Sequence, residues 1–322
     1  MAFTYGATGS TNILGIREFL AQNTLLDDRL LLAGLALMLV GLGFKVAAVP
    51  FHSWTPDVYQ GSPSPVVAFM ASVVKTAAFA GLLRVLHLAL GGFATDWQPV
   101  LYAMAIGSLL VGSVFALVQT DVKRLLAYSS ITHAGFLLVG VETNTDRGLS
   151  AVLFYLLSYT FMVIGSFGVV TLIGRRGDGA HSLDSLEGLG RRHPVLALAF
   201  TTLLFAQAGI PLTSGFVAKF NVIGAAVDAE DYVLAVVAMI AAVIGVYLYL
   251  RIIVGMYFTG GDHSDADADG EAEPEPVARI HTPAPAMLAL GAAVLATLVM
   301  GIVPDPFVDL ARDATPVLTL GG

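Results

Sequence analysis

The chain has 322 residues, 56% of them hydrophobic and only 12% charged, and its mean hydropathy is +0.79. A soluble domain carries about 25% charged residues, so this chain has too little polar sequence to cover a soluble core. The formal net charge of −8 offers no basic patch for nucleic acid, and the absence of cysteine excludes disulfides, thiolate-held iron–sulfur clusters and thiol-based zinc sites. The composition therefore predicts a polytopic membrane protein that does not bind nucleic acid.

Apolar stretches recur along the whole chain, each near the length of about 20 residues that crosses a hydrocarbon core. Their polarity does not alternate with a period of two, as barrel strands require, and a helix satisfies its own backbone in lipid. The sequence predicts an all-α, polytopic membrane helix bundle with about eight transmembrane helices. The expected spans are approximately residues 29–50, 63–91, 97–118, 122–142, 149–174, 195–224, 230–258 and 284–303.

These spans divide the chain into four regions. Residues 1–28 form an N-terminal tail and loop that resembles the end of a preceding span, and residues 29–258 form the bundle. Residues 259–283 are acidic and almost free of apolar side chains, which favours a solvated linker; calcium binding is the alternative, but the acidic run lacks a loop scaffold. Residues 284–322 hold the last span and the C-terminal tail. A short interfacial helical turn is expected at residues 181–194.

The basic residues divide unevenly between the two sides of the bundle. We call the side that holds the N-terminus side A, and the opposite side is side B. Because basic residues favour the cytoplasmic side of a membrane, side B is expected to be cytoplasmic. Side A carries Arg17, Arg29, Arg84, Arg147 and Arg312, whereas side B carries Lys123, Arg124, Arg175, Arg176, Arg191, Arg192, Arg251 and Arg279.

Three lysines remain, and all of them lie inside predicted spans: Lys45, Lys75 and Lys219. All 24 carboxylates fall in loops or at span ends, so the membrane interior holds amines and no acid. A charge at the bilayer centre costs about 2.5–3.5 kcal/mol on insertion scales and usually faces a wet cavity or the bundle interior. Removal from water disfavours the charged form of an amine, so such a lysine can load and release a proton near neutral pH. The pattern indicates a proton relay.

Two of these lysines differ in depth. Lys75 follows Pro63 by 12 residues, which is about 18 Å along a helix, so its amine cannot easily reach either interface. Lys45 lies five residues before Pro50, which breaks the first span. For Lys45, reaching the interface by snorkelling therefore stays open as an alternative to a relay role.

Lys219 lies in a span that Gly209, Pro211 and Gly215 interrupt, so the helix there is broken or kinked. Non-helical backbone at membrane depth is tolerated where it packs in protein or lines water. A broken helix beside an ionisable residue is typical of ion-translocating membrane proteins. This pattern makes Lys219 a candidate relay residue.

Histidines provide further candidates. His133 lies mid-span, where nearby Ser129, Ser130 and Thr132 favour a hydrated path over a packed histidine. His52 lies just past the break at Pro50. Two roles are open for it, a proton-uptake group or a partner for the helix end. Trp54 beside it is a candidate for the aromatic belt at the interface. The chain's seven histidines show no pairing typical of haem, and no glycine-rich phosphate loop is present, so no cofactor is expected in this chain.

Several stretches resemble one family. "GLGFKVAAVPFHSWTPDVYQGSPSPVVAFMASVVKTAAFAGLLR" is similar to the central signature of the antiporter-like membrane subunits of respiratory complex I. "DVKRLLAYSSITHAGFLLVG" resembles the next signature, and "AGIPLTSGFVAKF" resembles the broken helix of the second inverted repeat. Subunits L, M and N and their relatives in multisubunit sodium/proton antiporters share these motifs. Lys219 stands where subunit M has a glutamate, which favours subunit N.

The resemblance implies a proton-translocating subunit of NADH–quinone oxidoreductase in a bacterial inner membrane, with flavin and iron–sulfur clusters on partner subunits. It implies membrane neighbours of the antiporter-like subunit M type and the small subunit K type, besides lipid. Carried over, Lys45 is the lysine of the first broken helix, Lys75 the central relay, Lys219 the terminal lysine, and His133 a linking group. It also puts side B in the cytoplasm. A sodium/proton antiporter subunit and a non-pumping scaffold remain alternatives.

This chain departs from the family in one respect. Family members have several helices before "TGSTN", including one that bears a glutamate partner for Lys45, whereas this chain starts at "MAFTYGATGSTN". We therefore expect an N-terminally truncated member, in which most of the first inverted repeat is missing.

Overall fold

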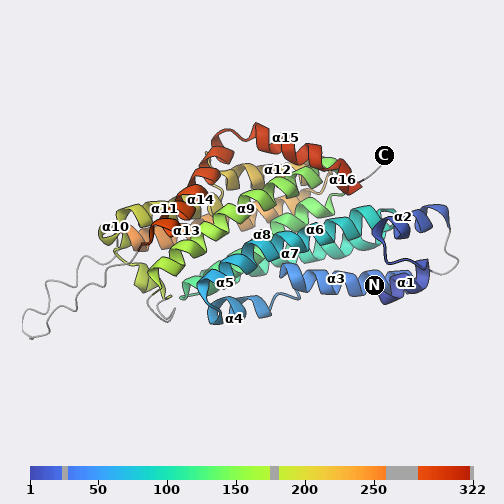
Figure 1. Cartoon of the computed structure of the whole chain (residues 1–322), viewed down its shortest axis with the longest axis horizontal. Coiled ribbons are helices and arrows are strands. Elements are labelled where there is room, and N and C mark those ends of the chain that lie inside the picture. Colours follow the sequence, from blue (N-terminus) through green and yellow to red (C-terminus); the bar gives the residue numbers. More distant parts are fainter. Residues whose placement is uncertain (24–27, 175–180, 259–281, 320–322) are drawn as a thin grey trace, which may run out of the picture.

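The described part of the chain is helical throughout, apart from short turns and one isolated bridge between Asp121 and Ser182. The computed structural model describes residues 1–23, 28–174, 181–258 and 282–319. Its elements (Figure 1) are α1 Ala2–Thr8, α2 Ile13–Gln22, α3 Arg29–Val46, α4 Trp54–Gly61, α5 Ser64–Phe69, the π-helical turn η1 Met70–Val74, α6 Lys75–Leu83, the π-helical turn η2 Arg84–Ala89, the short 3₁₀ turn η3 Gly91–Phe93, α7 Ala94–Leu117, α8 Val122–Glu142, α9 Asp146–Ile173, the 3₁₀ turn η4 Leu183–Leu186, α10 Leu189–Arg192, α11 Pro194–Ala208, α12 Ser214–Asp228, α13 Tyr232–Phe258, α14 Ala284–Ile302, α15 Asp305–Ala314 and α16 Pro316–Thr319.

Seven segments of the described chain are long and apolar enough to cross a membrane. Eight spans were predicted, and the difference lies in the sixth, because that span is divided into α11 and α12, two helices of 15 residues each. The expectation of an all-α bundle with two broken helices is confirmed, since the first break separates α3 from α4.

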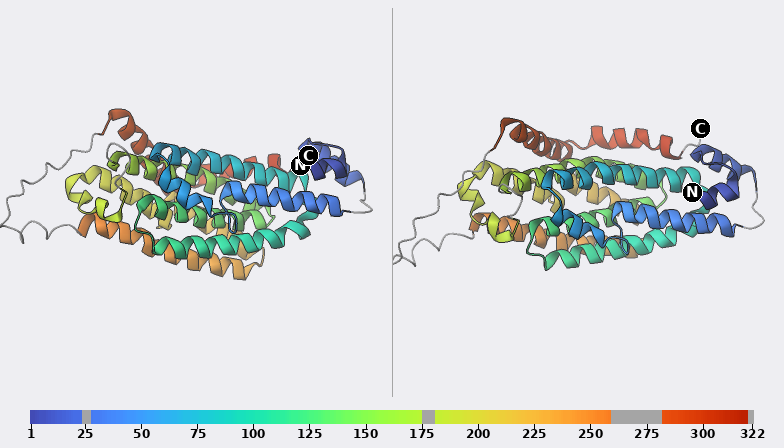
Figure 2. Two further views of the ribbon diagram at one scale, coloured as in Figure 1. Left: turned by 90° about the horizontal axis from the view of Figure 1, so that it is seen from below. Right: turned by 60° about the horizontal axis from the view of Figure 1, so that its bottom comes forward.

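The long helices run side by side along the longest axis of the molecule, with α1 and α2 at one end, side A, and α4 and α10 at the other, side B (Figures 1 and 2). Helix α8 forms the centre of this bundle. In its most apolar stretch 94% of the residues are buried, whereas the other six spans reach at most 56%. A side chain on α8 can therefore meet partners from several helices without leaving the protein.

Small residues allow α7 and α8 to approach closely. A Cβ at Gly112 would lie 2.6 Å from the backbone nitrogen of Thr132, and one at Gly135 would lie 2.8 Å from that of Leu109. Without a hydrophobic force between helices in lipid, close packing of this kind provides much of the association energy. It also fixes the rotation of α8, and hence the direction in which its polar side chains point.

The first break is tied together by polar contacts. Helix α3 ends at Val46, and Trp54 at the start of α4 donates its indole N–H to the carbonyl of Phe44 at 3.0 Å. The backbone N–H of Val49 donates to Ser108 Oγ at 2.9 Å, which anchors the break to α7. Backbone groups at a break need such partners, because water is scarce at membrane depth.

The second break is closed by glycine. Gly209 adopts φ +86°, the left-handed conformation that a glycine adopts easily, and so ends α11. A Cβ at Gly215 would lie 1.8 Å from the carbonyl oxygen of Ala206. Gly301 of α14 packs equally closely on the turn, since a Cβ there would lie 2.3 Å from the backbone of Thr213. The break is therefore a compact joint.

Some regional expectations are refined by the structure. Residues 181–194 hold η4 and α10, in agreement with a short helical turn there. The described residues 1–23 contain the helices α1 and α2, and the C-terminal tail contains the helices α15 and α16, which were not predicted. Most of the acidic region lies outside the described residues, as do Arg175, Arg176 and Arg279.

We predict that Gly215→Ala strongly destabilises the bundle. The new methyl would overlap the carbonyl of Ala206, so α11 and α12 would have to separate, at a cost of about 1–3 kcal/mol or more. Thermal unfolding of the purified protein in detergent measures this as a lower Tm. Gly168→Ala is the matched control, because a Cβ at this helical glycine meets nothing within 4 Å and should raise Tm or leave it unchanged. Equal Tm values for the two variants would contradict the close packing at the break.

Candidate functional site

Lys75 lies at the centre of the bundle, directly after the π-helical turn η1, and is 2% exposed. Its Nζ donates to the carbonyl of Ser130 at 2.6 Å and to the hydroxyl of the same residue. The amine also lies 5.7 Å from the ring centroid of Tyr159, within cation–π range. Serine and the aromatic ring thus replace the water that the amine loses on burial.

Lys219 lies in the first half of α12 and reaches back across the second break. Its Nζ donates to the carbonyls of Gln207 and Ala208, each at 2.8 Å. These carbonyls end α11, where the helix macrodipole favours positive charge. The amine lies 5.1 Å from the ring centroid of Phe136, and the side chain is 7% exposed. The break therefore produces the acceptors that a buried amine needs.

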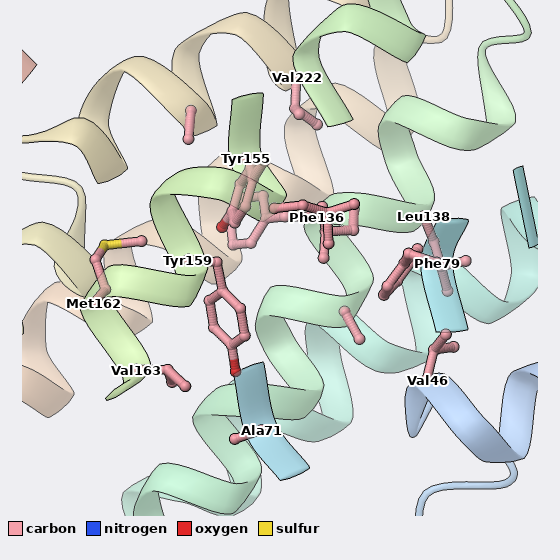
Figure 3. Close-up of a cluster of buried hydrophobic side chains, with 14 of the residues drawn as sticks. Val46, Ala71, Phe79, Phe136, Leu138, Tyr155, Tyr159, Met162, Val163 and Val222 are labelled. Atoms are coloured by element: carbon pink, nitrogen blue, oxygen red, sulfur yellow. The ribbon is translucent and has the colours of Figure 1, made fainter. Parts of the chain in front are cut away.

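His133 of α8 lies between the two lysines in a hydroxyl-rich setting. Its Nδ1 is 2.8 Å from the hydroxyl of Tyr155, and its Nε2 is 3.3 Å from that of Tyr249. The hydroxyl of Tyr249 is in turn hydrogen-bonded to Ser129 Oγ. The imidazole also packs on Tyr159, with 5.0 Å between ring centroids. Figure 3 shows Tyr155 and Tyr159 entering this region from α9.

A small cavity joins His133 to Lys219. It has room for about one water molecule. Its polar lining includes donors and acceptors that could hold a water, from α8, α11, α12, α13 and α7. The lining residues are Ser113, Ser129, Thr132, His133, Phe136, Gln207, Lys219, Ala241, Gly245, Leu248 and Tyr249.

The electrostatic character of this site follows from its residues. Within the described ranges neither Lys75 nor Lys219 has a carboxylate partner, and both amines are satisfied by carbonyls and hydroxyls. Also among the described residues, no group of three or more histidines and carboxylates is placed to hold a metal ion. Amine, imidazole and phenol groups joined by hydroxyls can accept, hold and pass protons.

Comparison with known proteins places this arrangement in a family. Residues 1–245 match the family described as NADH:quinone oxidoreductase/Mrp antiporter, TM. The chain belongs to this family. We shorten its name to the antiporter family.

Individual relatives match the chain over nearly its whole length. The chain is 46% identical over 327 aligned positions to NADH-quinone oxidoreductase subunit N of Mycobacterium bovis, covering 99% of this chain and 58% of the relative. A subunit structure from respiratory complex I of Thermus thermophilus with bound aureothin matches at 36% identity and TM-score 0.77, over 96% of this chain and 63% of that one. The Mrp complex from Dietzia sp. matches at 26% identity and TM-score 0.83, over 99% of this chain and 62% of that one. The chain thus spans somewhat more than half the length of these relatives.

The structure brings together three of the four predicted relay residues, namely Lys75, His133 and Lys219. Lys45 lies apart from them. It is in the last turn of α3 and is exposed on the surface of this chain. A role for Lys45 in the relay stays a prediction.

The supporting residues fall at the two breaks. Pro50 lies in the turn between α3 and α4, and Pro211 lies between α11 and α12, next to Gly209. His52 is half-buried, and this burial lowers the pKa of its imidazole, although a hydrogen bond to the backbone of Pro50 opposes the effect. Trp54 bonds to α3, so it joins the two sides of the break.

Sequence reasoning missed two kinds of residue. Lys123 was counted on side B and not among the lysines inside the spans, but it is 1% exposed, and its Nζ donates to the carbonyl of Ser62 at 2.7 Å. Lys123 lies one residue after the start of an apolar span, a position that fits a buried side chain as well as an exposed one. The tyrosines around His133 were also missed, because a tyrosine in an apolar span has no distinctive pattern. They are Tyr155, Tyr159 and Tyr249.

We predict that Lys45 alone among the four lysines reacts with acetic anhydride in the folded protein. Lys75, Lys123 and Lys219 are at most 7% exposed, and buried amines engaged in hydrogen bonds react slowly, whereas Lys45 is exposed. Mass spectrometry of the labelled peptides measures the extent of acetylation at each lysine. Labelling in denaturant is the control, in which all four should react alike. Rapid labelling of Lys75 or Lys219 in the folded protein would contradict the buried site.

Proposed function

We propose that this chain belongs to a proton-translocating membrane subunit of NADH–quinone oxidoreductase, of the subunit N type. Electron transfer from NADH to quinone takes place on other subunits, and this chain carries protons across the membrane. One observation supports the proposal above the others: two buried amines without carboxylate partners flank His133. Lys75 and His133 share the ring of Tyr159, and Lys219 and His133 line one cavity with room for water.

The chemistry follows from repulsion between like charges. Two ammonium groups in one apolar bundle repel each other more strongly than in water. Protonation of Lys75 therefore favours release of a proton from Lys219, and the reverse. A change of charge at one end of the line then moves protons along it. The carbonyls at the end of α11 stabilise the ammonium form of Lys219 without neutralising it.

The relatives suggest which member of the antiporter family this is. The similar chain from Mycobacterium bovis is named NADH-quinone oxidoreductase subunit N. A lysine at position 219, where subunit M has a glutamate, also favours subunit N. We infer a place in a bacterial inner membrane, with side B in the cytoplasm. The partners are the other complex I membrane subunits, of the M and K types, and the flavin and iron–sulfur clusters lie on further subunits. Lys45, on the exposed face of α3, joins the path through a carboxylate that such relatives supply from another helix.

A sodium/proton antiporter subunit is the second candidate. Its support is the likeness to the Mrp complex, whose TM-score of 0.83 exceeds that of the complex I structure although its identity is lower, 26% against 36%. The two functions differ in their energy source. Proton movement that requires NADH favours the oxidoreductase, whereas proton movement driven by a sodium gradient without NADH favours the antiporter. Neighbouring genes for flavin and iron–sulfur subunits would likewise favour the first.

We predict that Lys75→Ala in the full-length gene abolishes most proton pumping. Relay steps of this acid–base kind contribute about 10²–10⁴-fold, so the pumping rate should fall at least about tenfold. Inverted membrane vesicles with a pH-sensitive dye give the pumping rate, which is divided by the rate of NADH oxidation. Arg84→Ala is the matched control, because Arg84 lies on the same membrane segment but is exposed. Unchanged pumping in Lys75→Ala, at normal NADH oxidation, would remove the relay from this chain.

A further inference from the structure

We infer that Tyr249 of α13 is a proton-carrying residue that accepts a proton from His133 and passes it toward Lys219 through the water-sized cavity that all three residues line. The inference rests on the proposed proton-translocating function. Tyr249 is 3% exposed and is the one α13 side chain that hydrogen-bonds to the polar groups of α8 within the described chain.

The position of the Tyr249 hydroxyl sets it apart from other groups near the site. It contacts His133 Nε2 at 3.3 Å and Ser129 Oγ, and it lines the cavity that also contains Lys219. Tyr155 bonds the opposite ring nitrogen of His133 and is not among the residues around that cavity. Tyr155 therefore holds the imidazole in its orientation, whereas the Tyr249 hydroxyl can accept a proton from the imidazole and pass it into the cavity.

One side of the cavity between His133 and Lys219 is apolar. Phe136 lies one turn along α8 from His133, with 6.5 Å between ring centroids, and the Lys219 amine faces the same phenyl ring. A phenyl ring has no exchangeable proton. Of the polar groups around the cavity, Tyr249 is the one with a hydrogen bond to His133. A proton that leaves His133 Nε2 therefore has the Tyr249 hydroxyl as its hydrogen-bonded acceptor.

The transfer balances at each atom. A phenol donates one proton and accepts others through its oxygen lone pairs. When His133 is an imidazolium, its Nδ1–H donates to the Tyr155 oxygen and its Nε2–H donates to the Tyr249 oxygen, while the Tyr249 proton points to Ser129 or to a water in the cavity. The Nε2–H bond breaks as a new O–H bond forms on Tyr249, and the original phenol proton passes to the cavity water. That water then gives a proton to the neutral Lys219 amine. One charge moves, and each hydroxyl ends with one proton.

The test replaces Tyr249 with phenylalanine in the full-length gene. Tyr249→Phe keeps the ring and removes only the hydroxyl, so the pumping rate per NADH oxidised should fall at least about tenfold. Residual pumping should show a larger solvent deuterium isotope effect, because proton transfer across the gap becomes rate-limiting. A merely structural role for the ring would not change the isotope effect. Tyr247→Phe is the matched control, since Tyr247 lies on the same helix and is 64% exposed.

Two outcomes separate this inference from the proposed function. Normal pumping and a normal isotope effect in Tyr249→Phe, with pumping lost in Lys75→Ala, would overturn the role of Tyr249 and leave the function standing. Normal pumping in both variants would overturn both. If Tyr249→Phe failed to assemble, Ser129→Ala would test the hydroxyl chain from its other end. Normal pumping and a normal isotope effect there would also overturn the inference.

Discussion

The structure depends on one constraint, which is that amines placed in an apolar bundle without carboxylates still need hydrogen-bond acceptors. An unsatisfied polar group in such surroundings costs several kcal/mol. The protein meets this need with backbone carbonyls and hydroxyls instead of acids. An acid would pair with the ammonium and hold it charged, whereas a carbonyl stabilises it less and leaves the amine free to change its protonation state. The chemistry of the site follows from that choice of acceptor.

Helix geometry decides where such acceptors occur. Carbonyls in the middle of a helix already accept a hydrogen bond within the helix, so helix ends and side-chain hydroxyls are the acceptors most available to a buried amine. Lys219 uses the end of α11, which exists at this depth only because Gly209 ends the helix. Lys75 uses Ser130 of the buried helix α8, whose hydroxyl and backbone carbonyl both accept from the amine. The break and the serines of α8 thus serve the same physical purpose.

The sequence was informative where a residue conflicts with its surroundings. A lysine in an apolar span, or glycine and proline inside a helix, violates the local pattern, so Lys75, Lys219 and the break at Gly209 could be found without a structure. Tyr249 could not, since a tyrosine is ordinary in an apolar helix and its role comes from contact with α8, more than 100 residues away in sequence. The burial of Lys123 was missed for a related reason: position near a span end does not distinguish a buried side chain from an exposed one, and here burial depends on the turn that carries Ser62.

The two broken helices differ in how the free carbonyls at the break find hydrogen-bond donors. Both breaks lie near a lysine, but the orphan carbonyls are satisfied differently. At the first break Trp54 and the backbone N–H of Ala47 both bond to Phe44, and the N–H of Ala48 bonds to Gly43, so Lys45 is not needed as a cap. At the second break the amine of Lys219 supplies the cap itself. Loss of a proton from Lys219 therefore weakens contacts that hold α11 to α12, whereas the hydrogen bonds at the first break do not involve the amine of Lys45. Protonation of a lysine is thus coupled to helix packing at the second break, and other groups hold the first.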